Sequence, residues 1–130
     1  MYDRLKELIK NSYSVYSNFS TACIVEMKDG NTFEGVNVEN PSFKDGLCAE
    51  QVAIGAAISN GYTKGDFERL YLIGCKEHFI TPCFLCRQLI VELIEDEKKV
   101  ISYNIKGDSK EYVIGELCPD SFTERDLEND

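Results

Sequence analysis

The chain has 130 residues, of which 43% are hydrophobic, and its formal net charge is −9 at pH 7. This length predicts a single domain, residues 1–130, that can bury a core without cross-links. The negative charge disfavours nucleic-acid binding, because phosphate backbones attract lysine and arginine. No apolar run reaches the roughly 20 residues that span a bilayer. The first ten residues lack the apolar segment of a signal peptide, so we expect a cytoplasmic protein.

Hydrophobic spacing, interrupted by glycine and proline, divides the chain into helices and strands. In chain order, the predicted elements are a helix over 2–12, strands over 21–27 and 32–37, a loop over 38–47, a helix over 48–60, a strand over 70–75, a helix over 83–94, strands over 100–105 and 111–114, and a helical turn over 115–118. Between the first two strands, Asp29-Gly30 is a good hairpin signal. The order predicts a mixed sheet with helices on its faces, and residues 121–130 are expected to be a flexible acidic tail.

Three of the six cysteines stand at the predicted starts of two helices. Cys48 precedes Ala49-Glu50, and Cys83 and Cys86 lie in the sequence Pro-Cys-Phe-Leu-Cys. The positive end of a helix lowers a thiol pKa and so favours the thiolate that zinc binds. Three thiolates leave the fourth tetrahedral position open for water, and Glu50 is well placed to move the protons of that water. The pattern therefore predicts a catalytic zinc site.

Other interpretations of the cysteines stay open on the residues alone. The pair Cys83 and Cys86 also has the spacing of a redox dithiol. Cys75 or Cys118 could instead complete a closed four-cysteine zinc site. Neither alternative explains Glu50, although a glutamate in the first turn of a helix often only complements the helix dipole.

The cysteines outside the motifs, Cys23, Cys75 and Cys118, are predicted to be buried small hydrophobic residues, and His78 is predicted to be a polar loop residue. Two further classes of function stay open. A non-catalytic zinc-binding scaffold would leave Glu50 without a role. A polynucleotide editor needs a basic groove with stacking aromatic residues, and the net charge of −9 argues against one.

Together, these motifs resemble those of the cytidine deaminase family over most of the chain. The matching segments are Tyr16-Ser17-Asn18-Phe19, Asn37-Val38-Glu39-Asn40, Cys48-Ala49-Glu50, Pro82-Cys83 through Cys86-Arg87-Gln88, and Glu116-Leu117-Cys118-Pro119 with Phe122. The resemblance implies an α/β fold with three αβα layers around a five-stranded mixed sheet. It also implies a homotetramer with active sites at subunit interfaces and one zinc ion per subunit. The implied reaction is hydrolytic deamination of cytidine or deoxycytidine, a step of pyrimidine salvage that releases ammonia.

The same resemblance implies a role for each residue of the site. The zinc ligands would be Cys48, Cys83 and Cys86, and Glu50 would be the catalytic proton shuttle. The substrate-binding residues would be Phe19 against the base, Asn37 and Glu39 at the ribose 3′-hydroxyl, Ala49, and Phe122, which would close the site of a neighbouring subunit. Gln51 and Arg87 would lie just behind the ligands.

Three positions depart from the family pattern. Gln51 stands where the family usually has an arginine that offsets the charge of the thiolates, so Arg87 would be the remaining cation and slower chemistry is expected. Phe43 replaces a common tyrosine. Phe84 replaces a glycine, and its ring is expected to narrow or reshape the pocket. Relatives that deaminate blasticidin S also lack the arginine, so the alternatives are a deaminase of that compound or of another aminated heterocycle, and a catalytically silent zinc-binding homologue.

Overall fold

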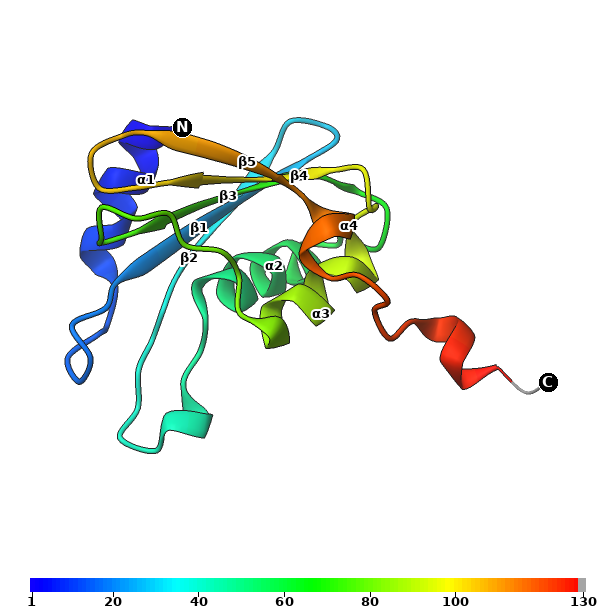
Figure 1. The fold of residues 1–130 in the computed structure, drawn as a ribbon, viewed down its shortest axis with the longest axis horizontal. Helices are drawn as coiled ribbons and strands as arrows, with labels where there is room; N and C mark the ends of the chain where they lie inside the picture. Colours follow the sequence, from blue (N-terminus) through cyan, green and yellow to red (C-terminus); the bar gives the residue numbers. More distant parts are fainter. Residues whose placement is uncertain (129–130) are drawn as a thin grey trace.

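The computed structural model describes residues 1–128. Its middle layer is a five-stranded sheet with the strand order β2-β1-β3-β4-β5 (Figure 1). The strands are β1 (Thr21–Met27), β2 (Thr32–Val36), β3 (Phe67–Gly74), β4 (Lys99–Tyr103) and β5 (Ser109–Val113), and the α-helices are α1 (Tyr2–Leu8), α2 (Ala49–Ser59), α3 (Phe84–Leu93) and α4 (Ile114–Leu117). Neighbours β3 and β4 run parallel and the other neighbouring strands run antiparallel, so the sheet is mixed.

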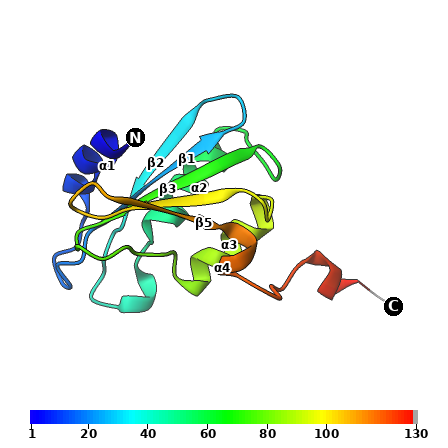
Figure 2. The same ribbon diagram turned by 45° about the horizontal axis from the view of Figure 1, so that its top comes forward.

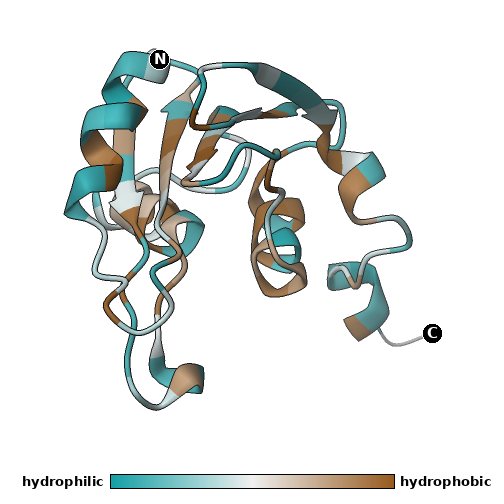
Figure 3. Ribbon diagram, turned by 60° about the vertical axis from the view of Figure 1, so that its left-hand side comes forward, coloured by the Kyte–Doolittle hydropathy of each residue, from teal (hydrophilic) through white to brown (hydrophobic). Residues whose placement is uncertain are grey.

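Helices cover both faces of this sheet, which makes the fold a three-layer αβα arrangement (Figure 2). Alternate residues of β1 separate the two cores, because successive side chains of a strand point to opposite faces. Cys23, Val25 and Met27 belong to the core that contains residues of α2 and α3, whereas Ala22 and Ile24 pack with α1. Figure 3 shows that α1, at the N terminus, is mainly hydrophilic with a hydrophobic band, as expected for a helix that covers a sheet from outside. The predicted fold class is confirmed.

The predicted helices and strands are present, with shifted ends. The first helix continues beyond Leu8 as a 3-10 turn, Ile9–Asn11, and β3 begins at Phe67 rather than at residue 70. The predicted loop before α2 contains another 3-10 turn, Phe43–Asp45. Within the segment predicted to be a flexible tail, Glu124–Leu127 form a 3-10 turn, and residues 129–130 of that segment lie outside the described part of the chain. Across residues 1–128, none of the helices combines the length and hydrophobicity needed to cross a membrane.

The first turn of α2 rests directly on Gly35 of strand β2. A Cβ atom at Gly35 would lie 2.5 Å from the Ala49 carbonyl oxygen and 2.5 Å from the Ala53 nitrogen. Both atoms belong to backbone, so no side-chain movement could make room. Because the same turn carries Cys48 and Glu50, the missing side chain at Gly35 sets where these two residues stand above the sheet.

We expect Gly35→Ala to lower the free energy of unfolding by roughly 2 kcal/mol or more, because its methyl group would push α2 off the sheet. Urea unfolding measures this change. The matched control is Gly55→Ala within α2, where no atom lies within 4 Å of the added carbon. That control should gain roughly 0.5–1 kcal/mol, because alanine favours a helix over glycine. Equal unfolding midpoints for Gly35→Ala and the wild type would refute the close contact.

Candidate active site

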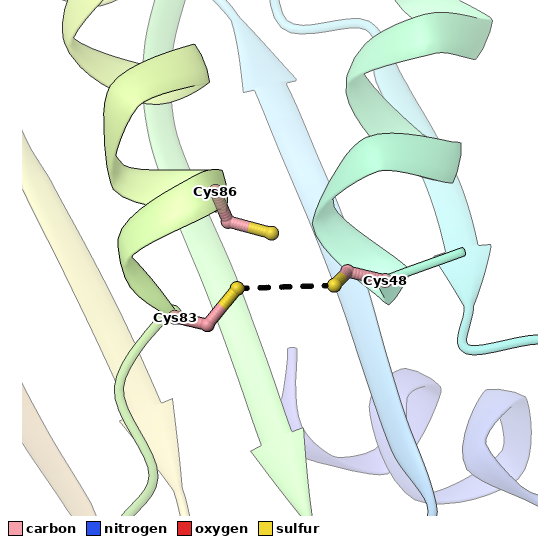
Figure 4. A group of neighbouring side chains, drawn as sticks. All are labelled: Cys48, Cys83 and Cys86. Atoms are coloured by element: carbon pink, nitrogen blue, oxygen red, sulfur yellow. Dashed lines mark hydrogen bonds between the residues drawn. The ribbon is translucent and has the colours of Figure 1, made fainter. Parts of the chain in front are cut away.

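The two cysteine motifs meet where α2 and α3 begin. The sulfur atoms of Cys48, Cys83 and Cys86 all lie within 4.8 Å of one another, and those of Cys48 and Cys83 are 3.9 Å apart. Figure 4 shows the three side chains pointing toward one another from the two helix ends. Bonds of 2.3 Å to a tetrahedral zinc ion would separate its sulfur ligands by about 3.8 Å. The spacing and the chemistry of these donors therefore fit a zinc ion with one coordination position left free.

Burial makes the ligand thiols harder to ionise than the helix ends alone would suggest. Desolvation raises the pKa of Cys86, and the negative charges of Glu50 and Cys48 add to the shift. Desolvation is also the main reason why the pKa of Cys48 is raised. The pKa values of both thiols are therefore raised rather than lowered, with burial as the main cause. A divalent cation would supply the positive charge that such a group of thiolates needs.

Glu50 lies beside the cysteines in the first turn of α2, with only 5% of its surface exposed. Burial raises the pKa of its carboxyl group, and a hydrogen bond with Cys86 opposes part of that shift. A buried carboxyl whose pKa is raised above its ordinary value is better able both to take up and to release a proton. The geometry therefore places a buried carboxyl group next to the candidate metal site.

A cavity of about 410 Å³ opens in front of these residues. Its lining consists of Phe19, Thr21, Asn37, Cys48, Glu50, His78, Phe79, Ile80, Thr81 and Cys83. The volume lies in the usual range for small-molecule sites. Phe19 and Asn37 were expected to bind substrate, and the structure brings both into the cavity with Glu50. His78 was expected to be a polar loop residue, and the structure places it in the cavity wall.

The side chain of Asn37 ties the segment before β1 to the cavity. Its Nδ2 donates to the Phe19 carbonyl oxygen at 2.8 Å, and its Oδ1 accepts from the Thr21 amide at 3.0 Å. The Ser12 hydroxyl donates to the same Oδ1. These contacts fix which end of the amide is the nitrogen, and they leave one Nδ2 hydrogen without a partner among the described residues.

Glu39 anchors the same segment from a groove that adjoins the cavity, and Asn37 and Cys48 line both spaces. One carboxylate oxygen of Glu39 accepts from the amides of Tyr16 at 3.0 Å and Ser17 at 3.1 Å, and the other accepts from the Ser17 hydroxyl. The Ser17 hydroxyl is the main reason why the pKa of Glu39 is lowered. The carboxylate therefore stays ionised at neutral pH, and it would release the segment only as the pH falls through that lowered pKa.

Gln51 and Arg87 lie behind the ligands and act through the backbone. The Gln51 Oε1 accepts a hydrogen bond from the Cys48 amide at 2.8 Å, which caps α2 at the ligand itself. The Arg87 guanidinium donates to the Pro82 carbonyl at 2.6 Å, to the Leu117 carbonyl at 2.7 Å and to the Thr81 hydroxyl at 2.8 Å. Arg87 thus fixes the chain immediately before Cys83, a role that the sequence pattern did not reveal.

Three exposed aromatic residues near the site, Phe43, Phe84 and Phe122, are not part of the lining of this cavity. Phe84 is 71% exposed, and the Arg87 guanidinium lies over its ring, 4.4 Å from the centroid. The prediction that Phe84 narrows this pocket is wrong, because its ring is not part of the lining. Phe43 is also exposed and lines the adjoining groove. Phe122 is exposed, and its carbonyl accepts a hydrogen bond from Gln88 at 2.7 Å.

Ala49 and the three cysteines outside the zinc motifs differ in how deeply they are buried. Ala49 is fully buried against β2, where its carbonyl oxygen faces Gly35. All six cysteines are free thiols, and Cys23 is buried as predicted. The prediction that Cys75 and Cys118 are buried is wrong, since both are partly exposed at the ends of elements, where loops cover them incompletely.

Comparisons with known proteins point in one direction. A family profile described as the cytidine and deoxycytidylate deaminase zinc-binding region matches residues 1–103. A relative from Mycoplasma genitalium, named cytidine deaminase, is 34% identical over 119 residues, which cover 92% of this chain and 90% of the relative. The crystal structure of cytidine deaminase from Burkholderia pseudomallei superimposes with a TM-score of 0.85 at 35% identity, covering 94% of this chain and 99% of that one. A relative from Bacillus cereus, named blasticidin-S deaminase, is 29% identical over 107 residues, or 76% of this chain and 74% of the relative.

We expect purified protein to hold about one zinc ion per chain after dialysis, and Cys83→Ala to hold far less, because removing one thiolate breaks the ligand set. Elemental analysis measures the zinc content. Cys118→Ala is the matched control, because this thiol is also partly exposed but lies outside the cluster. Full zinc content in Cys83→Ala, or an equal loss in Cys118→Ala, would show that the cluster is not the metal site.

Proposed function

Because this chain belongs to the cytidine and deoxycytidylate deaminase family, we propose that it hydrolyses cytidine, deoxycytidine or both to the corresponding uracil nucleoside and ammonia. The observation that carries this proposal is the buried Glu50 beside three converging thiols, at one cavity with Phe19 and Asn37. Six free thiols suit a reducing compartment, so we place the reaction in the cytoplasm.

Zinc is the cofactor, and we assign Cys48, Cys83 and Cys86 as its ligands. When bound there, zinc would supply a water molecule whose pKa lies near neutrality. Glu50 would accept one proton of that water and deliver it to N3 of the pyrimidine while the water oxygen bonds to C4. The same carboxylate would then take the second proton of that oxygen and pass it to the amino group, so the C4–N bond breaks and ammonia leaves as a C4 carbonyl forms. The raised pKa of Glu50 suits a group that holds and releases a proton twice in one cycle.

The other cavity residues would hold the nucleoside for this chemistry. We propose that the Phe19 ring packs against the base and that Ala49 backs the base beside the catalytic turn. Asn37 has an uncommitted Nδ2 hydrogen, which suits the ribose 3′-hydroxyl as acceptor. Glu39 would accept the hydrogen of the same hydroxyl, because an ionised carboxylate can accept further bonds beyond those from Tyr16 and Ser17.

The surface around the site supports an assembled enzyme, which we propose to be a homotetramer with its active sites at subunit interfaces. Large hydrophobic side chains are exposed on the motifs and loops of the site, namely Tyr13, Val15, Tyr16, Val38, Phe43, Leu47, Phe84, Leu85 and Phe122. Exposed apolar side chains that gather around one site are typical of a surface that contacts another protein. Phe122 would close the site of a neighbouring subunit.

We expect sedimentation equilibrium to give the mass of four chains. Replacing Phe43 and Leu47 together with serine should yield smaller species and lower activity, because both side chains are exposed and line the groove beside the site. Ile58→Ser is the control, an exposed apolar residue on α2 that lies outside this groove. A fully active monomer would contradict the proposed assembly.

We expect zinc-loaded protein to deaminate cytidine and deoxycytidine and to release one ammonia per nucleoside. Glu50→Ala should lower kcat by roughly a thousandfold, because general acid–base catalysis is lost. The readouts are the ultraviolet change of the base and an ammonia assay, with blasticidin S as a third substrate. Glu92→Ala, an exposed carboxylate on α3, is the control. Turnover of blasticidin S alone would keep the zinc chemistry and overturn the roles given to Asn37 and Glu39.

A further inference from the structure

One wall of the cavity is the connection between β3 and α3, and side chains outside the deaminase motifs hold it. His78, Phe79, Ile80 and Thr81 all line the cavity, and Cys83 follows directly. Loops of this kind are usually the mobile part of a site, so what fixes their position also fixes the shape of the pocket. The inference below rests on the proposed function, because it concerns how the same site accepts a nucleoside.

Two buried polar side chains, Ser102 in β4 and Asn104 directly after this strand, form hydrogen bonds with this wall. Among residues 1–128, the buried polar or charged residues are Glu50, Ser102 and Asn104. The Ser102 hydroxyl donates to the Ile80 carbonyl oxygen at 2.7 Å, and the Asn104 Nδ2 donates to the Glu77 carbonyl oxygen at 2.9 Å. Apart from Glu50, the buried polar groups therefore hold the two ends of the cavity wall.

The position of Ser102 in β4 explains why a hydroxyl is found in a buried strand. Val100, two residues earlier, lies on the same face of β4 and belongs to the hydrophobic core under α2 and α3. Ser102, in contrast, faces the backbone of the cavity wall at Ile80. A buried hydroxyl without a partner would cost free energy, and the hydrogen bond to the Ile80 carbonyl oxygen removes that cost.

Gly74, at the end of β3, forms the surface on which the Ile80 side chain packs. A Cβ atom at Gly74 would lie 3.0 Å from both Cδ1 and Cγ2 of Ile80. The missing side chain lets the wall lie close to the sheet, and the Ser102 hydrogen bond keeps it there. This surface lies at the carboxyl ends of the parallel strands β3 and β4, the edge of α/β sheets where ligands bind.

We propose that Ser102 and Gly74 are positioning residues that set the depth of Ile80 and thereby the width of the nucleoside cavity. Neither touches the reacting atoms. Ser102 restrains the wall through its hydrogen bond, and Gly74 gives the wall room to lie back. On the far side of Ile80, Arg87 binds Thr81 and Pro82, so the wall is held from β4 and from α3 at once.

The test compares zinc-loaded Ser102→Ala, Ser102→Thr and Val100→Ala with the wild type, using deoxycytidine or cytidine, whichever the wild type accepts. Ser102→Ala should raise KM roughly tenfold and change kcat much less, because a displaced wall weakens binding more than proton transfer. Ser102→Thr keeps the hydroxyl and should restore KM. Val100→Ala destabilises the same face of β4 without touching the wall, so its KM should stay at the wild-type value.

Amide hydrogen exchange gives a readout that needs no activity. Residues 77–81 should exchange faster in Ser102→Ala than in Ser102→Thr and Val100→Ala, because the wall has lost its anchor. Gly74→Ala should also raise KM, but with slow exchange, because its methyl group pushes a still anchored Ile80 into the cavity. This variant tests the proposal even where Ser102→Ala fails to fold.

The outcomes separate this inference from the proposed function. If the wild type deaminates no nucleoside, the proposed function fails, whereas unchanged exchange in Ser102→Ala overturns the anchoring role on its own. A KM in Ser102→Ala equal to that of the wild type, or an equal rise in Val100→Ala, would also overturn it, because either result leaves only a general effect on stability.

Discussion

Contact between the backbone of α2 and the backbone of β2 is the constraint on which the rest of the site depends. Gly35 allows the first turn of the helix to lie on the strand without an intervening side chain. That turn carries a ligand cysteine and Glu50, so their height above the sheet follows from the contact. The start of α3 must then meet the start of α2 at sulfur-to-sulfur distances that suit one metal ion. Small displacements of α2 would therefore move Cys48 and Glu50 together relative to the other two cysteines.

The features that local sequence determines could be predicted. Hydrophobic period and turn residues located the helices and strands, and the family motifs pointed to the zinc chemistry. The wall of the cavity could not be predicted in this way. Ser102 and Ile80 are 22 residues apart in the sequence, and Asn104 and Glu77 are 27 apart. Neither short segment contains a pattern that would identify its hydrogen-bond partner. His78 lies in a loop as predicted, but its place in the cavity wall could not be foreseen, because that wall is held by these distant contacts.

Errors of another kind arose where two physical effects compete. A helix N-terminus lowers a thiol pKa and burial raises it, and only the structure shows that Cys86 is buried and that burial raises its pKa. The exposed Phe84 was expected to intrude on the pocket, but the ring lies against Arg87 instead. Gln51 is a further example. The sequence comparison identified Gln51 only as the loss of a positively charged arginine. In the structure its side chain accepts a hydrogen bond from the Cys48 amide and so caps the helix.

The three-way contact of Arg87 has a consequence for the order in which the molecule is completed. Its guanidinium joins Thr81 and Pro82, just before Cys83, to the carbonyl of Leu117, which lies 30 residues further along the chain than Arg87. During synthesis the N-terminal part of a protein emerges from the ribosome first. All three thiols are therefore available before the acceptor that steadies one of them exists. The segment before Cys83 is therefore fully held only after Leu117 has been made, so the final geometry of the site depends on residues well beyond its own motifs.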